Sequence, residues 1–98
     1  MSIISVAGSL LIRERIAIDP GAIATVKIVD AEGEVLGATA VEATGIPVDF
    51  AVTIDEEFIT GDLFVWAVLR TNVGAWGTLE LEPYTGDSAE VVLTRIED

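Results

Sequence analysis

Apolar and polar residues alternate along most of this chain, as they do in β-strands that bury one face. The alternation is cleanest after Pro47, where four large apolar residues are separated by small or polar ones: Val48, Phe50, Val52 and Ile54. Similar patterns over residues 3–13, 22–30 and 35–42 predict three further strands. Gly33 suits a hairpin turn between the last two, which predicts an antiparallel pair.

The second half of the chain continues in short strands. Residues 63–71 are apolar at both odd and even positions, which predicts either a central strand covered on both sides or a strand in the middle of a sandwich under an overlying loop. Residues 76–82 and 89–96 predict two more strands. Before the strand over residues 63–71, Asp55 can cap a single helical turn.

Seven short strands with turn residues between them predict one all-β domain over residues 1–98. We expect an antiparallel β-sandwich of about seven strands, immunoglobulin/transthyretin-like in architecture. We expect Val26, Phe50 and Trp66 to pack in a core that lies between its two layers.

The charge balance limits the partners. Seventeen acidic residues against five basic ones give a net charge of −12, which repels nucleic acid phosphates and anionic lipid headgroups. We therefore expect neither nucleic acid binding nor membrane insertion by this chain as written. The 98 residues include no cysteine and no histidine, so the best thiol nucleophile and the usual general base near neutral pH are both missing. We expect no enzyme and no cofactor.

A charged triplet interrupts the first strand where it should bury its apolar face. Glu14 shares the parity of Ile12 and Ile16, and an unpaired inward carboxylate would cost several kcal/mol. We expect either a bulge that returns Glu14 to solvent or a structural ion pair; a ligand-binding or catalytic carboxylate is the alternative. The candidates for the ion pair are Arg13, Glu14, Arg15 and Arg70.

Two aromatic residues and one acidic loop are further candidates. Trp76 and Tyr84 either form an exposed binding surface or pack in the core or against an edge strand. The acidic residues between 55 and 62 could ligate Ca²⁺ in principle, but their spacing does not match the twelve-residue EF-hand loop. We expect no metal site.

The order of motifs is also informative. The block RERIAI at residues 13–18, followed by Pro20 and Ala22, is the specific part, and Gly8 precedes it. Further motifs follow at residues 26–30, 46–50, 65–68 and 92–95. In this order the chain resembles the YbaY/YscW family of small bacterial lipoproteins, which includes the pilotins of type III secretion.

The resemblance implies a compact β-sandwich without catalysis, attached by lipid to a membrane in the cell envelope. In the secretion members it implies help for an outer-membrane secretin to reach its place and assemble. The sequence as written has no cysteine for lipid attachment, and its first 15 residues lack the basic segment and long apolar centre of a signal peptide. The compartment is therefore not fixed by the sequence.

Two functions remain open from the sequence. The first is a non-enzymatic, chaperone-like accessory domain that binds a protein or cell-envelope component through edge strands and the Trp76/Tyr84 region. The alternative is a small-ligand module that holds a sugar, lipid or ion at one end of the sandwich. A filled core with an apolar surface stripe favours the first, and a deep pocket lined by tryptophan and carboxylates favours the second. Weak self-association through an edge strand is also possible, and acidic repulsion should weaken it at low salt.

Overall fold

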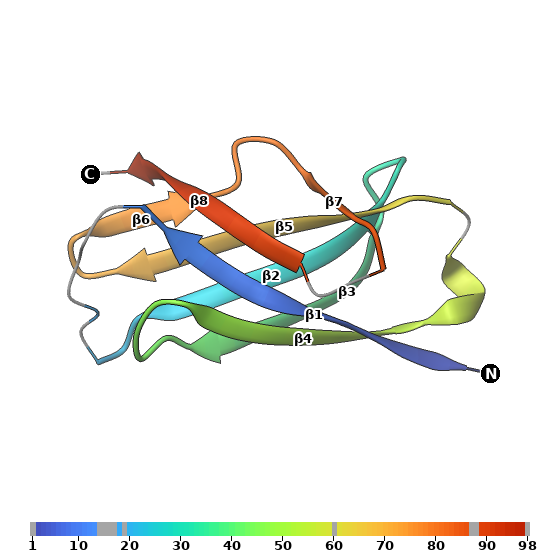
Figure 1. Ribbon diagram of the computed structural model, residues 1–98, viewed down its shortest axis with the longest axis horizontal. Coiled ribbons are helices and arrows are strands. Elements are labelled where there is room, and N and C mark those ends of the chain that lie inside the picture. The colour runs from blue at the N-terminus through green and yellow to red at the C-terminus, as the bar shows by residue number, and fades with distance from the viewer. Residues whose placement is uncertain (1, 14–17, 19, 60, 87–88, 98) are drawn as a thin grey trace.

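The computed structural model describes residues 2–13, 18, 20–59, 61–86 and 89–97, which form eight strands and one short 3₁₀ helix (Figure 1). In chain order these elements are β1 (Ile3–Ile12), β2 (Ile23–Asp30), β3 (Val35–Glu42), β4 (Val48–Asp55), η1 (Glu56–Phe58), β5 (Leu63–Thr71), β6 (Gly74–Gly77), β7 (Glu82–Tyr84) and β8 (Ala89–Glu97). No helix in this part of the chain has the length and apolar character needed to cross a membrane.

Most of the predicted elements are confirmed. The strands expected over residues 3–13, 22–30 and 35–42 lie within a residue of β1, β2 and β3, and β2 and β3 pair as an antiparallel hairpin. The predicted helical turn is η1, where the Asp55 carboxylate accepts a hydrogen bond from the Glu57 amide at 2.9 Å. Local alternation and capping were sufficient signals for these elements.

The layering differs from the predicted sandwich. The strands follow one hydrogen-bonded path, β3-β2-β5-β6-β8-β1-β4, and β7 pairs with β5 beside that path. Figure 1 shows the wall of β4, β1 and β8 crossing in front of the wall of β3, β2 and β5. Because β6 pairs with both β5 and β8, it joins the two walls into a nearly closed, barrel-like sheet. The immunoglobulin-like expectation was too specific, since alternation reveals which side chains face inward and not which strands are neighbours.

One pairing is parallel. Residues 89–93 of β8 run beside residues 8–12 of β1 in the same direction, so the expectation of an entirely antiparallel fold is wrong at this point. The predicted strand over residues 76–82 is also wrong, because it divides into β6 and β7 with a bend between them. The chain contains eight strands in its described part instead of seven for this reason.

The two ends of the strand path, β3 and β4, lie against each other without a hydrogen-bonded ladder between them in the described residues. Gly37 of β3 lies close against β4. A Cβ atom at this position would lie 2.7 Å from Cγ2 of Ile54 and 2.9 Å from the backbone oxygen of Thr53. Only glycine fits at this distance, and each terminal strand therefore covers the edge of the other.

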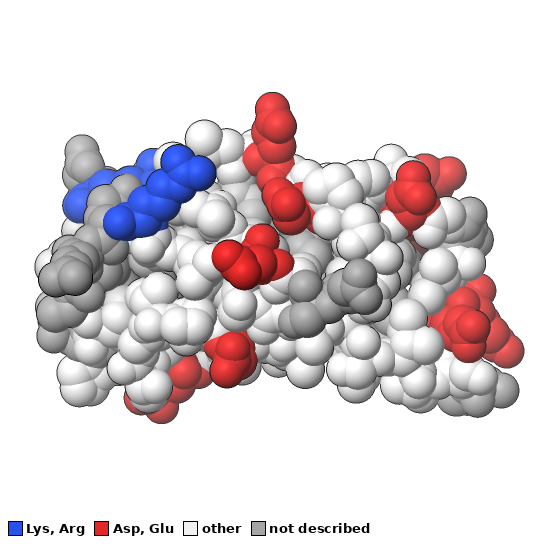
Figure 2. Space-filling model, in the orientation of Figure 1, with Lys and Arg blue, Asp and Glu red and all other residues white. Residues whose placement is uncertain are grey.

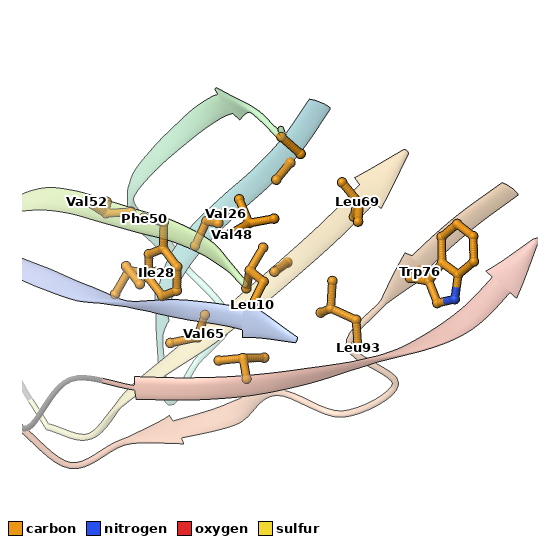
Figure 3. Close-up of a cluster of buried hydrophobic side chains, with 14 of the residues drawn as sticks. Leu10, Val26, Ile28, Val48, Phe50, Val52, Val65, Leu69, Trp76 and Leu93 are labelled. Carbon is orange, nitrogen blue, oxygen red and sulfur yellow. The ribbon is translucent and has the colours of Figure 1, made fainter. Parts of the chain in front are cut away.

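The interior is filled by aliphatic side chains from both walls (Figure 3). Val26 is 0% exposed and Phe50 is 5% exposed, as expected of core residues. Trp76 is also 0% exposed and fills one end of the interior beside Leu93. Burial of large apolar surface of this kind is the main favourable term in folding.

Trp66 does not belong to this core, contrary to the sequence-based expectation. It lies on the outward face of β5 with Phe64 and Val68, and all three are half-buried. The ammonium of Lys27 on neighbouring β2 lies 4.9 Å from the centroid of the Trp66 ring. The apolar residues on both faces of β5 indicated a strand covered on both sides, but in the structure only its inward face is fully covered.

Gly8 sits where β8 begins to pair with β1. A Cβ atom at Gly8 would lie 2.2 Å from the backbone oxygen of Ala89, and backbone cannot rotate away as a side chain can. We expect Gly8→Ala to lower the free energy of unfolding by about 1–3 kcal/mol, as overpacking in a filled interior does. Urea denaturation followed by circular dichroism measures the change.

Gly45→Ala is the matched control, because nothing lies within 4 Å of a Cβ at Gly45 and its φ is not in the left-handed region. It should leave stability within about 0.5 kcal/mol or raise it slightly. Equal effects of the two substitutions would show that the close approach of β8 to β1 does not hold.

The two tryptophans should respond differently to truncation. Trp76→Ala should cost about 3–5 kcal/mol because it empties a buried site, whereas Trp66→Ala on the outward face should cost about 1 kcal/mol. Thermal and urea unfolding measure the loss of stability in both variants. In the native protein an aqueous quencher such as acrylamide should reach the indole of Trp66 and leave that of Trp76 almost untouched. A larger loss of stability at Trp66 would contradict this assignment of the core.

Candidate functional site

The first half of β8 has a hydrogen-bonded neighbour on one side only. Residues 89–93 pair with β1, and the pairing of β6 with β8 begins at Thr94. Within the described residues no strand pairs with the opposite edge of residues 89–93, because β7 pairs with β5 instead. We call this edge of residues 89–93 the open edge.

The open edge exists because the chain bends away after β6. The Thr78 amide donates to the backbone oxygen of Ala67 at 3.0 Å, and the Thr78 hydroxyl accepts from the Ala67 amide at 3.3 Å. These two bonds hold Thr78 on β5, with its hydroxyl as the acceptor in place of a backbone oxygen, and the next residues arch outward before β7 pairs with β5. Figure 1 shows this arch between β6 and β7 on the β8 side of the molecule.

A surface hollow of about 300 Å³ lies between the arch and β8. It is lined by Thr78, Leu79, Glu80, Glu82, Val92 and Thr94, and we call it the β8 hollow. Three apolar side chains at or beside it are well exposed: Leu79 is 71% exposed, and Leu81 and Val92 are each 41% exposed. Apolar side chains grouped in this way beside an unpaired strand edge are typical of a contact surface.

Charges are distributed unevenly around β8. Two of the residues that line the β8 hollow are acidic, and Glu90 is exposed in β8, two residues before Val92. Figure 2 shows acidic side chains over the middle of this face and the basic ones gathered at the end where β1 and β8 finish. Arg13 follows β1 there, and it lines a second hollow of about 330 Å³ with residues 92–94 of β8.

The structure decides between the two sequence-based expectations for Trp76. Its ring is buried, and the Arg95 guanidinium lies 5.1 Å from the ring centroid while donating to the backbone oxygen of Val73 at 2.9 Å. Trp76 therefore cannot present an exposed surface. Tyr84 is half-buried, and its hydroxyl donates to the backbone oxygen of Gly86 at 3.2 Å. The two rings do not form the shared binding surface that the sequence suggested.

Only two of the four residues proposed for an ion pair, Arg13 and Arg70, lie in the described part of the chain, so the ion pair stays a prediction. Glu14 and Arg15 lie outside the described residues, while Arg13 and Arg70 are both exposed. Arg70 shares the outward face of β5 with Trp66 and Val68, where it lies opposite Ile23 of β2. The parity argument placed Arg70 correctly with Trp66 and Val68, but that face points outward, away from the core.

The acidic turns have structural roles. The buried Asp30 carboxylate accepts hydrogen bonds from the amides of Glu32 and Glu34, each at 2.9 Å, and so closes the hairpin between β2 and β3. Asp55 caps η1 in the same manner. Among the described residues no three acidic side chains converge as metal ligands would.

The small-ligand alternative needs a pocket lined by tryptophan and carboxylates. The β8 hollow supplies carboxylates but no aromatic ring, since Trp76 is in the core and Trp66 lies on β5. Its volume is at the lower limit of the roughly 300–1,000 Å³ typical of small-molecule pockets. Its most distinctive feature is a strand edge, which suits a polypeptide.

Sequence reasoning missed the β8 hollow because the leucines and glutamates of residues 79–82 alternate like a strand. Gly77 pairs with Thr94, so an unbroken ladder would have placed Leu79 opposite Val92. Nothing in the local pattern shows that the pairing with β8 stops after Gly77. The bend follows from the tertiary pairing of β7 with β5.

Comparison with known proteins identifies the family and the fold of the chain. The family of the type III secretion system lipoprotein chaperones (YscW) matches residues 1–93. Among solved structures, the chain is similar to an alternative pilotin from the type II secretion system of Vibrio cholerae, with a TM-score of 0.79 and 23% identity over 99% of this chain and 98% of that chain. This likeness shows a shared fold. No curated protein sequence matches the chain. The extent of the family match confirms the resemblance read from the motifs: the chain belongs to the YscW family of type III secretion system lipoprotein chaperones.

Proposed function

We propose that this chain is a non-enzymatic accessory chaperone that binds a protein component of a secretion system in the cell envelope. The expected partner is an outer-membrane secretin, because that is what the family resemblance implies. The observation that supports protein binding best is the group of exposed apolar residues beside the open edge, at the β8 hollow.

Three properties of the molecule favour contact with a protein. The interior is filled by side chains from both walls, so the surface is the part of the described molecule that can bind. Leu79, Leu81 and Val92 each expose 41% or more of their surface, and burial of such surface yields roughly 25 cal/mol per Å². The net charge of −12 disfavours nucleic acid and anionic lipid as alternatives.

The terminal strand edges are less suited to this role. Edge strands usually offer unpaired backbone groups to a partner, but β3 and β4 are covered by each other at Gly37. The contact surface that we propose is therefore the β8 side of the barrel.

The experiment is capture of the secretin from detergent-solubilised envelope of the source bacterium on the immobilised full chain, with quantitative mass spectrometry. We expect the secretin to be enriched on the native chain. The double variant Leu79→Ser and Leu81→Ser should reduce the captured amount about tenfold, since loss of two apolar contacts of this size removes more than about 1.4 kcal/mol of binding free energy.

The control is the double variant Ile3→Ser and Val35→Ser, which changes two residues that are 60% and 50% exposed and lie away from β8. It should capture as much secretin as the native chain does. Failure of the native chain to enrich the secretin would contradict the proposed function, and equal losses in the two double variants would contradict the proposed surface.

A further inference from the structure

The open edge presents backbone amide and carbonyl groups that can pair with one more strand. Successive residues of a strand direct their amide and carbonyl groups to opposite edges, so about half of those in residues 89–93 point away from β1. In the described part of the molecule no ladder uses them. An extended peptide could satisfy these groups as it adds to the sheet.

The side chains of β8 define what such a peptide would meet on each face. Val91 and Leu93 point inward and are 1% and 2% exposed, whereas Glu90, Val92 and Thr94 point outward and are exposed. A peptide beside β8 would follow the same alternation. Its inward side chains would meet the margin of the apolar core, and its outward side chains would meet the β8 hollow.

The outward positions would meet carboxylates on the side of the arch, whereas Arg13 lines the second hollow with Val92 and Thr94. Glu80 and Glu82 line the β8 hollow, and Glu90 stands on the outward face of β8 itself. Lysine and arginine suit this environment, because their aliphatic stems can cover Leu79 and Val92 while their charges approach the glutamates. A second acidic strand would be repelled.

We propose that the open edge accepts a strand from the partner protein, and that this segment alternates apolar residues facing inward with lysine or arginine facing outward. The inference depends on the proposed function and adds to it the mode of contact and the chemistry of the partner segment. Strand addition joins the partner to β1 and β8 in one continuous ladder. Leu79 and Glu80 on the arch form the opposite wall of the site.

The probe is a nine-residue peptide of alternating valine and lysine with both ends blocked, added to the ¹⁵N-labelled full chain. We expect saturable binding with amide shifts and new hydrogen-exchange protection in residues 89–93, at the amides that point away from β1. Before the peptide is added, these same amides should exchange faster than those bonded to β1.

Two N-methylated peptides separate strand pairing from attraction between charges. One carries methyl groups on the valine amides and the other on the lysine amides, and neither changes charge. Since only one set of amides can face β8, at least one of the two peptides should bind about tenfold more weakly or worse, as loss of several backbone hydrogen bonds implies.

Matched variants of the protein test the location. Glu80→Lys should weaken binding of the alternating peptide about fivefold, the upper range for an exposed charge pair. Glu42→Lys makes the same change of charge on exposed Glu42 of β3 and should change the affinity less than about twofold. Both residues are exposed, so neither variant should disturb folding.

Several results would overturn the proposal. These are the lack of saturable binding at millimolar peptide, protection on β3 or β4 instead of β8, equal binding by all three peptides, and equal effects of the two lysine variants. Dimerisation of the chain with protection of the open edge would also overturn it, because a second copy would then be the added strand.

The failure of this inference can be told apart from failure of the proposed function. If the chain captures the secretin but the peptide does not bind at β8, strand addition is wrong and the accessory role stands. If the peptide binds at β8 but no secretin is captured, the open edge accepts a strand and the proposed secretin partner is wrong.

Discussion

The parallel pairing of β1 with β8 is the constraint on which the rest of this structure depends. It joins the first strand of the chain to the last one, and it needs a glycine at residue 8 because the backbone of Ala89 occupies the space that a side chain would fill. With β8 fixed beside β1, the short strand β6 connects the two walls. The interior then closes around aliphatic side chains and Trp76.

The same arrangement determines where the molecule can interact. A nearly closed barrel has few unpaired edges, and here the two terminal strands cover each other at Gly37. β6 is only four residues long, whereas β8 has nine, so part of β8 is left without a second neighbour. The open edge is thus a direct result of unequal strand lengths in a nearly closed wall.

The charges around the open edge determine which partner segment it favours. Basic side chains gather at the end of the barrel where β1 and β8 finish, while Glu80 and Glu82 line the β8 hollow. An unpaired strand edge can pair with the same edge of a second copy of the protein. The glutamates beside this edge oppose such pairing, because they would repel those of the second copy. Acidic side chains beside this edge therefore disfavour pairing with a second copy and favour a basic partner segment.

Much of the fold could be predicted from the sequence, because alternation over residues 48–55 and similar segments is a local property that survives in the tertiary structure. The turn at Asp30 and the cap at Asp55 are local in the same sense. Membership of the family could also be read from short motifs. These features depend on residues close together in the chain.

Only the tertiary structure decided which strands are neighbours, which of the two tryptophans is buried, and where an edge is left unpaired. Trp66 and Trp76 both lie in apolar segments, and their fates depend on the side of the sheet that becomes the interior. Residues 79–82 have the pattern of a strand, yet they do not extend β6 beside β8, and the chain instead returns to β5 as β7. Local alternation specifies faces, whereas pairing between distant segments specifies edges, and the candidate site of this protein is an edge.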